Sequence, residues 1–498
     1  MISRRTVTAL ALAFTSLASA AWAPSARAQA APDAFVTDTR QIVRIGQGAL
    51  SGTVKDGVAY HLGIPYAAPP VGELRWRPPA AAPAWTGERD ASRPGASCQA
   101  SEGCLFLNVV RPAGARPGDR LPVMVWIHGG AYVIGTSMGA FGGDTEGTNF
   151  AKKGIVHVSL NYRLGRAGWF AHPALSKEGP TGNYGMMDQI AALTWVKANI
   201  ARFGGDPKDV TIYGESAGGV SVHYLMLAPQ AKGLFAKAIG ESSFARHKPE
   251  PLAEAEAKGL KAAKAAGVEG EDAAAAAALR KLPLTALPYT GGLVGRAGPI
   301  LDGTYITGGI AEGYAAGRQA KVPLMLGGNS HEASLFRPQP AQLDALPADR
   351  RAAVMKVFDP EGTGDGARVV NDLTTAQFIT EPDRNLARLH ARAGQPVWLY
   401  YFSYVPGSQV AKKPYGAGHT DEIRFVFGAP RASFGPEDLP LSDAMNGFWA
   451  SFAKTGSPGA AWPKFQPGER SIEFGQDGAQ VRAEHLKARL DLVEAGQK

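Results

Sequence analysis

Apolar runs and amphipathic patterns alternate along the middle of the chain. Residues 121–127 and 154–160 are near-continuous apolar runs, the pattern of strands buried on both faces of a parallel sheet. Residues 188–203 carry apolar side chains at helical spacing, and residues 210–213 form another short apolar run. A strand, a helix and a strand in this order predict a right-handed crossover unit, so the pattern indicates an α/β protein.

Further stretches extend this sheet and add a cap. The patterns predict strands at residues 234–240, 322–327 and 396–404, an N-terminal β-hairpin or meander at 42–63, and a helix at 444–454. Residues 252–290 are instead rich in Ala, Glu and Lys with helical periodicity, which predicts two or three helices inserted over the sheet as a cap. Because there is no internal repeat and no clear linker, we expect one domain, residues 29–498, built on a large, mostly parallel central sheet flanked by helices.

Residues 211–219 predict a nucleophile at the end of the 210–213 strand. The run Gly214-Glu215-Ser216-Ala217-Gly218 fits the G-x-S-x-G pattern, in which a serine occupies a strained turn between a strand and a helix. The flanking glycines leave room for neighbouring backbone, and the following helix directs its N-terminal N–H groups at the serine. The alternative is a Gly-rich turn that contains a serine by chance, because the pentapeptide alone is a weak signal.

Candidates for a base and an acid follow Ser216 in the chain. A serine hydroxyl needs a base beside it, and the base needs an acid that holds it in the right tautomer. Histidines follow at positions 223, 247, 331, 390, 419 and 485, and His419 lies in a loop of small residues beyond the 396–404 strand. Glu332, directly after the 322–327 strand, is the expected acid. Asp302 and Asp421 compete with it, although Asp302 precedes any strand end and Asp421 is very near His419 in sequence.

Composition and charge exclude several classes of protein. With 45% hydrophobic and 19% charged residues the chain is ordinary for a soluble protein. The net charge is +8, but the Lys and Arg residues are scattered, so no nucleic-acid-binding patch is expected. Beyond the N-terminal segment no stretch approaches 18 uninterrupted apolar residues, so we expect no membrane span.

Residues 1–28 have the features of an export signal. Arg4 and Arg5 precede an apolar stretch at residues 6–21, and residues 26–28 match a small-x-small cleavage site, which makes Gln29 the expected mature N-terminus. Residues 18–20 form an alternative cleavage site, and Ser3-Arg4-Arg5 suggests the twin-arginine route. A membrane anchor is the alternative, but the apolar run is too short and lacks a second charged flank. We therefore expect a periplasmic or secreted protein.

The two cysteines of the chain, Cys98 and Cys104, are close in sequence. In an exported chain an even count at short spacing suggests one disulfide, and two free thiols are the alternative. No second Cys or His pair stands at ligand spacing, so we expect no metal site.

Longer motifs resemble a known family. Stretches that carry the resemblance lie at residues 63–67 and 69–72, 101–109, 161–165, 203–207, 214–219 and 418–422. Together they are similar to the type-B carboxylesterases, which include cholinesterases and bacterial p-nitrobenzyl esterases, from about residue 43 to residue 465. The resemblance implies an α/β-hydrolase fold and a serine carboxylesterase that acts through an acyl-serine intermediate on a small-molecule ester, without a cofactor.

The resemblance also implies roles for particular residues. It implies a catalytic triad, three backbone N–H donors of an oxyanion hole and a disulfide, which fall on Ser216, Glu332 and His419, on Gly130, Ala131 and Ala217, and on Cys98 and Cys104. Tyr132, Phe141, Phe244 and Phe336 are candidates for lining the substrate pocket, with core packing as the alternative.

The chain departs from the family pattern at three places. Ala131 stands where a third glycine is usual, and His331 and Ala333 flank Glu332 where Asp and Gly are usual. Glu241 replaces a usual glutamine, and we expect it to pair with a lysine, with burial near the base as the alternative.

Other functions stay open at this level. An amidase or a lactonase could use the same triad. A non-catalytic binding protein could share the fold, although the presence of Ser216, Glu332 and His419 together argues against it.

Overall fold

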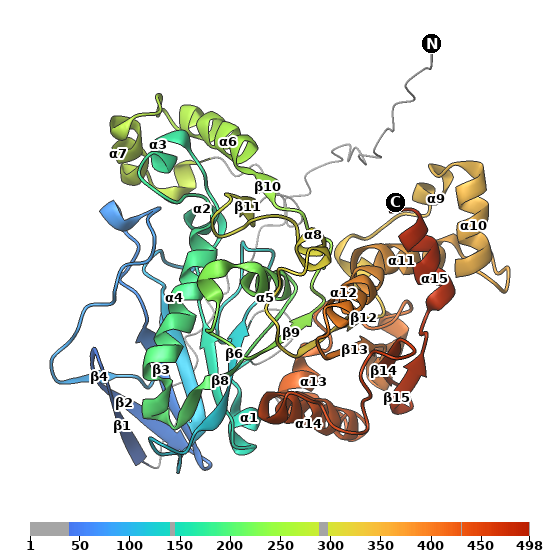
Figure 1. The fold of residues 1–498 in the computed structure, drawn as a ribbon, viewed down its shortest axis with the longest axis horizontal. Coiled ribbons are helices and arrows are strands. Elements are labelled where there is room, and N and C mark those ends of the chain that lie inside the picture. The colour runs from blue at the N-terminus through green and yellow to red at the C-terminus, as the bar shows by residue number, and fades with distance from the viewer. Residues whose placement is uncertain (1–38, 140–144, 288–296, 430, 498) are drawn as a thin grey trace. The chain divides into compact units, whose positions relative to one another are not determined.

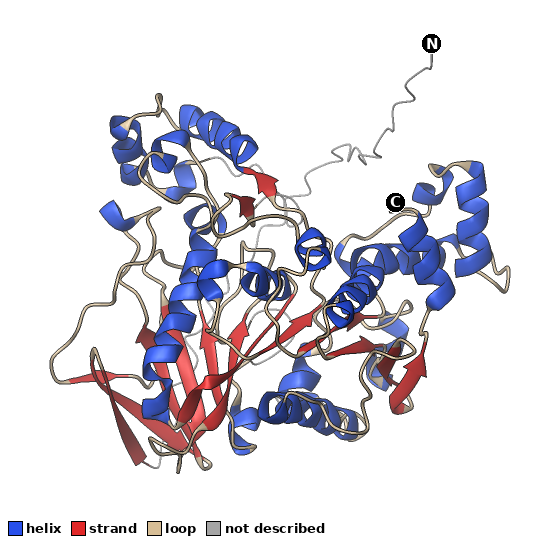
Figure 2. Cartoon of the chain, in the orientation of Figure 1, coloured by secondary structure: helices blue, strands red, loops and turns tan. Residues whose placement is uncertain are grey.

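The strands predicted from the apolar runs lie in one large sheet in a computed structural model of the chain (Figures 1 and 2). The structure describes residues 39–139, 145–287, 297–429 and 431–497. The predicted signal at residues 1–28 and Phe141 lie outside these ranges.

Thirteen strands of the described residues form this sheet, in the order β1-β2-β3-β5-β7-β6-β8-β9-β12-β13-β14-β15, with β4 paired to β2. From β7 to β14 neighbours run parallel, whereas β1 to β7 and β14 to β15 pair antiparallel. The predicted large, mostly parallel sheet is confirmed. The strands are β1 Thr39–Ile45, β2 Gly48–Lys55, β3 Val58–Pro65, β4 Glu88–Asp90, β5 Phe106–Pro112, β6 Leu121–Ile127, β7 Val156–Leu160, β8 Gly205–Glu215, β9 Lys237–Glu241, β12 Leu324–Asn329, β13 Val397–Phe402, β14 Arg470–Gly475 and β15 Gly478–Ala483.

Helices cover both faces of the sheet, and strand β6 shows how the sequence divides between them. Val123, Val125 and Ile127 belong to one apolar core, and Met124 and Trp126 belong to the other. This alternation follows from the two-residue period of a strand. A strand with a core on each side must be apolar at every position, which explains the continuous apolar run.

The first core packs under α4, α5, α8 and α12, and the second under α1, α13 and α14. The α-helices outside the cap are α1 Thr148–Lys152, α2 Gly165–Gly168, α4 Tyr184–Asn199, α5 Ala217–Leu227, α8 Ile310–Ala315, α9 Ala341–Asp344, α10 Ala348–Phe358, α11 Gly366–Thr375, α12 Glu381–Arg392, α13 Ile423–Phe427, α14 Leu439–Thr455 and α15 Lys487–Ala495.

The predicted helical cap is present. Helices α6 Leu252–Ala265 and α7 Ala273–Lys281 share a separate apolar cluster with α3 Pro173–Ser176, and Figure 1 shows the three grouped together. Two short strands, β10 Glu250–Pro251 and β11 Ile300–Leu301, pair in parallel beside α6. The Ala-rich run at residues 273–278 is helical, as expected, and Asp272 caps it by accepting a hydrogen bond from Ala275 N–H.

Some boundaries differ from the sequence patterns. Helix α4 begins at Tyr184, not near Asp188. Its first turn is buried at Tyr184 and Met187, and Asp188 is buried as well because it forms an ion pair with Arg163. The apolar pattern therefore fails to mark the first turn. Strand β5 and the hairpin β14–β15 were not predicted, whereas Cys98 and Cys104 form the expected disulfide, with their Cα atoms 4.9 Å apart.

Candidate active site

Ser216 occupies the turn between β8 and α5 in a strained backbone conformation, with φ 55° and ψ −122°. Its N–H donates to the Glu241 carbonyl of the neighbouring strand at 2.9 Å, which fixes the turn against the sheet. A side chain at Gly214 would meet the Ile127 carbonyl at 2.5 Å, and one at Gly218 would collide with the same carbonyl. The glycines of the motif are thus required by the backbone of β6.

His419 and Glu332 meet next to this turn. His419 Nδ1 lies 2.5 Å from Glu332 Oε2, and both side chains are buried. The other carboxylate oxygen of Glu332 accepts hydrogen bonds from Ser242 Oγ at 2.6 Å and from Asn329 N–H at 2.7 Å. These bonds fix the orientation of the carboxylate, and through it the tautomer of the imidazole.

The loops that carry these two residues are tied to each other. His331 N–H donates to the Ala417 carbonyl at 2.8 Å, so the loop after β12 and the loop before α13 run side by side. His419 N–H donates to Ser334 Oγ at 2.9 Å. Residues 87 positions apart in sequence are thereby held in hydrogen-bonding distance.

The competing acids have structural roles. Asp302 accepts hydrogen bonds from the N–H groups of Thr304, Tyr305 and Ile306 at 2.8 to 2.9 Å and closes a turn. Asp421 accepts from Gly418 N–H at 2.6 Å and forms an ion pair with Lys413. Neither is the carboxylate that contacts His419 Nδ1.

Glu215, the residue before the serine, contacts the other nitrogen of the imidazole. Its Oε1 lies 3.0 Å from His419 Nε2, outside hydrogen-bond geometry, so the contact is chiefly electrostatic. Burial by itself lowers the pKa of His419, but the charges of Glu215 and Glu332, together with the hydrogen bond to Glu332, raise that pKa well above its ordinary value. Sequence reasoning missed this residue, although it lies inside the motif.

Two further glutamates, Glu241 and Glu422, are fully buried close to Glu215. Glu241 accepts a hydrogen bond from Trp449 Nε1 at 2.7 Å, and burial raises its pKa to about 8. The expected pairing of Glu241 with a lysine is wrong: it is fully buried, and its Oε2 has no partner among the described residues. Glu422 bonds to Asn329 Nδ2, and burial together with the charges of Glu215, Glu332 and Glu241 raises its pKa well above the ordinary value.

Backbone donors face the serine from the loop after β6. Gly130, Ala131 and Tyr132 have positive φ angles of 102°, 52° and 61°. This conformation is strained for Ala131 and Tyr132, and strained backbone of this kind gathers at functional sites. Within the described residues the N–H groups of Gly130 and Ala131 donate to no acceptor, and Ala217 begins α5. These groups are available to a ligand oxygen.

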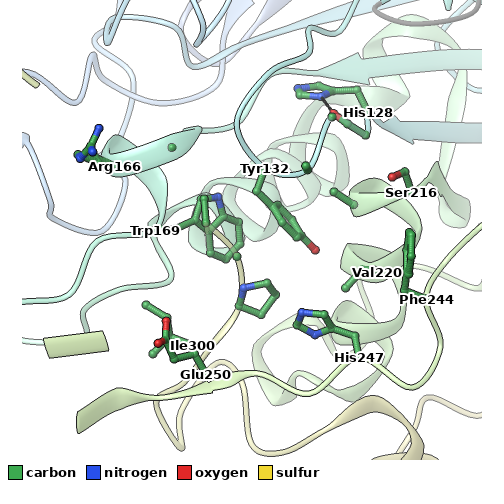
Figure 3. Close-up of a pocket in the computed structure, with 18 of the residues that line it drawn as sticks. His128, Tyr132, Arg166, Trp169, Ser216, Val220, Phe244, His247, Glu250 and Ile300 are labelled. Atoms are coloured by element: carbon green, nitrogen blue, oxygen red, sulfur yellow. Dashed lines mark hydrogen bonds between the residues drawn. The ribbon is translucent and has the colours of Figure 1, made fainter. Parts of the chain in front are cut away.

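A cavity of about 870 Å³ adjoins these groups (Figure 3). Its wall contains the loop glycines and Ala131, the elbow with Ser216 and Ala217, and His419. Tyr132 and Phe244 also line it, beside apolar residues that include Trp169, Val220 and Ile300. Phe336 does not line the described cavity: its ring packs against Phe244 and stacks on Phe378 with 4.5 Å between ring centroids. A direct role of Phe336 in substrate binding stays a prediction.

Two of the remaining histidines lie in buried hydrogen-bond networks. His223 contacts Tyr314 and Ser243, and His390 contacts the Val322 carbonyl. Burial lowers the pKa of both imidazoles. Within the described ranges no group of three or more His, Cys, Asp or Glu side chains is arranged to hold a metal ion.

Comparison with known proteins gives a consistent result. A family model described as the carboxylesterase family matches residues 39–359 and 351–492. The chain is 34% identical to fumonisin B1 esterase of Sphingopyxis macrogoltabida, over 91% of this chain and 90% of that protein. It is 33% identical to para-nitrobenzyl esterase of Bacillus subtilis (strain 168), over 86% of this chain and 93% of that protein.

Solved structures agree with the sequence relatives. A PNB esterase superposes with a TM-score of 0.77 at 29% identity, over 91% of this chain and 100% of that chain. A carboxylesterase of Geobacillus stearothermophilus superposes with a TM-score of 0.78 at 31% identity, with the same coverage. Among the residues that the structure describes, no helix has the length and apolar character needed to cross a membrane.

Proposed function

The chain belongs to the carboxylesterase family and is a carboxylic ester hydrolase, and from this premise we propose that Ser216, His419 and Glu332 are its catalytic triad. Ser216 is the nucleophile, His419 the general base and Glu332 the acid that orients the base. One observation supports this assignment above the others: the strained serine turn and the Glu332-bonded His419 border the same cavity.

The first half of the reaction forms an acyl-enzyme. Ser216 Oγ attacks the ester carbonyl while His419 Nε2 takes its proton, and Glu332 stabilises the resulting imidazolium. In this structure Nε2 lies beside Glu215 and makes no hydrogen bond to Ser216. Such bonds are often long in an unliganded enzyme and tighten when substrate binds. The alcohol then leaves with the proton from His419, and water hydrolyses the acyl-serine with the same base.

The tetrahedral oxyanion is bound by the N–H groups of Gly130, Ala131 and Ala217. Each such donor lowers the barrier by about 3 kcal/mol, because it is fixed in place before charge develops. Two of them lie on the loop whose positive φ angles turn successive N–H groups toward the cavity. The Ala131 methyl leaves its N–H intact.

The assignment of the nucleophile is tested by trapping the acyl-enzyme analogue. We expect an organophosphate to label the enzyme at one site, on the peptide that contains Ser216, and Ser216→Ala to lose both the label and ester hydrolysis without loss of fold. The measurement is mass spectrometry of the digested adduct together with turnover of p-nitrophenyl esters. Ser221→Ala, one turn further along α5, is the matched control and should keep the label. Residual activity of Ser216→Ala within tenfold of the wild type contradicts the assignment.

We also propose that residues 1–28 direct export and are removed, leaving a single-domain enzyme of residues 29–498 in the periplasm or outside the cell. The paired arginines, the short apolar stretch and the small-x-small site at 26–28 support this. N-terminal sequencing of the exported protein should begin at Gln29. A mature chain that retains residue 1 rejects the proposal.

A further inference from the structure

One polar side chain in the cavity wall is unused by the proposed mechanism. His247 lies on the segment that leads from β9 to α6 and lines the cavity, with its ring turned into it below the Tyr132 hydroxyl (Figure 3). Its backbone is held at both polar groups: its N–H donates to the Phe244 carbonyl at 2.7 Å, and its carbonyl accepts from Ile310 N–H at 3.2 Å. The imidazole is therefore presented from a fixed position.

The two nitrogens of the ring have different surroundings. Nδ1 lies 2.8 Å from the hydroxyl of Tyr224, a buried residue of α5. Nε2 has no hydrogen-bond partner among the described residues, and the ring lines the cavity (Figure 3). One side of the ring is anchored in the protein and the other is free for a ligand.

The contact with Tyr224 favours the tautomer in which Nε2 carries the proton. The Tyr224 hydroxyl can donate to Nδ1 at 2.8 Å or to the His247 carbonyl at 3.5 Å, and the shorter bond is the stronger one. When Nδ1 accepts this proton, the neutral imidazole carries its own proton on Nε2. Burial lowers the pKa of His247 to about 4, so the ring is uncharged at neutral pH. The cavity therefore meets a neutral N–H donor.

The neighbourhood makes this donor selective. Trp169, Val220 and Ile300 supply apolar wall in the same cavity. Both lysines of the cavity wall have carboxylate partners: Lys248 pairs with Glu312 at 3.3 Å, and Lys258 pairs with Glu250. A donor in an apolar wall favours a ligand that brings an acceptor to it, because an unpaired buried polar group is costly.

We propose that His247 Nε2–H is a specificity-determining hydrogen-bond donor for an oxygen acceptor remote from the scissile ester. The substrates it selects are esters whose acyl chain or alcohol carries a carbonyl or ether oxygen a few bonds from the reacting carbonyl. Plain hydrocarbon esters of the same size leave the donor unpaired. This inference rests on the proposed function, because it places the acceptor in the cavity that Ser216 opens into.

Matched ester pairs test the inference. One pair places the acceptor in the acyl chain, p-nitrophenyl 5-oxohexanoate against p-nitrophenyl hexanoate. The other places it in the alcohol, 2-ethoxyethyl acetate against pentyl acetate. For each pair the ratio of kcat/KM values is measured in the wild type, His247→Leu and His247→Gln, so that intrinsic reactivity cancels between enzymes. In at least one pair we expect His247→Leu to lower the preference for the oxygenated ester about tenfold, the size of one hydrogen bond.

Two further variants sharpen the result. His247→Gln keeps an N–H donor and should retain part of the preference. Ile300→Val changes the apolar wall without touching a donor, so it should alter both members of a pair alike. If His247→Leu leaves the ratios of both pairs unchanged while hydrocarbon esters are still hydrolysed, the inference is wrong and the proposed function stands. If Ser216→Ala hydrolyses these esters as the wild type does, the proposed function fails instead.

Discussion

Glu215 has two structural roles, one in the serine turn and one beside His419, and its position in the sequence indicates only the first. It belongs to the elbow that presents Ser216, yet its carboxylate lies 3.0 Å from the base. With Glu332 on the other nitrogen, the imidazole lies between two carboxylates, and the proton it takes from serine is stabilised from both sides. The same two charges disfavour the neutral imidazole of His419, which is the form that can accept the serine proton.

The pH profile of hydrolysis should report this contact. Only neutral His419 can act as the base, so kcat/KM should rise with pH through a midpoint above the ordinary histidine pKa of about 6.5. Glu215→Gln removes one negative charge that favours the imidazolium, so the midpoint should move to lower pH. The measurement is kcat/KM against pH for wild type and variant. Glu254→Gln, an exposed cavity residue on α6, is the control, and equal midpoints for wild type and Glu215→Gln would contradict the explanation.

A site residue could be predicted from the sequence only where its neighbours in the chain form a recognisable motif. Ser216 and the glycines beside it are recognisable because the turn imposes its own pattern over five positions. Glu241 was misread because a glutamate in a sequence looks like a surface charge. Its partner, Trp449, lies 208 residues away on α14. Ser242, which donates to Glu332, carries no sequence signal at all, because it reaches Glu332 only once β9 and β12 are paired.

At the scale of elements, the loop after β6 and the elbow after β8 form one unit. The two strands are parallel neighbours, so their carboxyl ends bring the proposed oxyanion donors and the proposed nucleophile to the same edge of the sheet. A side chain at Gly129 would lie 2.7 Å from the Glu215 carbonyl and 3.0 Å from Ser216 Cβ. The two loops are in contact with no space for a methyl group.

Gly129→Ala should therefore lower kcat/KM at least about a hundredfold, since a displacement near 1 Å of a catalytic group has an effect of this size. The fold should survive, because the strain is confined to two loops. Gly447→Ala on α14 is the matched control: a Cβ there meets nothing within 4 Å, so activity should stay at the wild-type level. Steady-state kinetics with circular dichroism would decide, and full activity of Gly129→Ala would show that the loops can separate at no cost.

The elements differed in how clearly the sequence marked them. Strand β6 was predicted with the observed bounds because burial on two faces leaves it apolar at every position, whereas the bounds of β7, β8 and β9 differ from the predicted 154–160, 210–213 and 234–240. Strand β5 was missed because it carries Asn108 and Arg111, which are polar and yet buried in hydrogen bonds. The hairpin β14–β15 was missed because half of it is exposed, so its charged residues look like a loop.

At the scale of the molecule, the C-terminal helix supports the half of the sheet that carries the acid and the base. The Arg384 guanidinium on α12 is only 3% exposed and pairs with Asp491 at 2.7 Å and Glu494 at 3.1 Å on α15. Leu490 and Val493 of the same helix are buried in an apolar cluster with α10 and α11. Helix α12 in turn packs against β12 and β13.

Removing residues 487–498 should lower the melting temperature by several degrees. The deletion leaves Arg384 as a buried charge without its carboxylates, which is costly, and it exposes apolar surface. Arg384→Met in the truncated chain should recover part of the loss, because it removes the uncompensated charge, whereas the same substitution in the full chain should not stabilise. Thermal unfolding of the four proteins gives the answer; an unchanged melting temperature after truncation would mean that α15 carries no stability.

The order of the strands in the sheet could not be predicted from local patterns, because an apolar run in the sequence does not indicate which other run it will pair with. Apolar runs indicated a parallel sheet, and the crossover rule predicted a right-handed connection from β7 through α4 to β8, but it did not predict that β6 lies between these two strands. That β9 pairs with β12, with 82 residues and the cap between them, depends on long-range packing.

This strand order bears on the sequence of events during folding. The nucleophile is in place once β6, β8 and β9 have paired, but its base arrives only with the chain beyond β13, some two hundred positions later. A chain that ends before residue 419 therefore contains Ser216 without its proposed base, and we expect it to be inactive. During refolding, the rate at which ester hydrolysis recovers should report the formation of these distant contacts. We expect it to be slower than the recovery of helical circular dichroism.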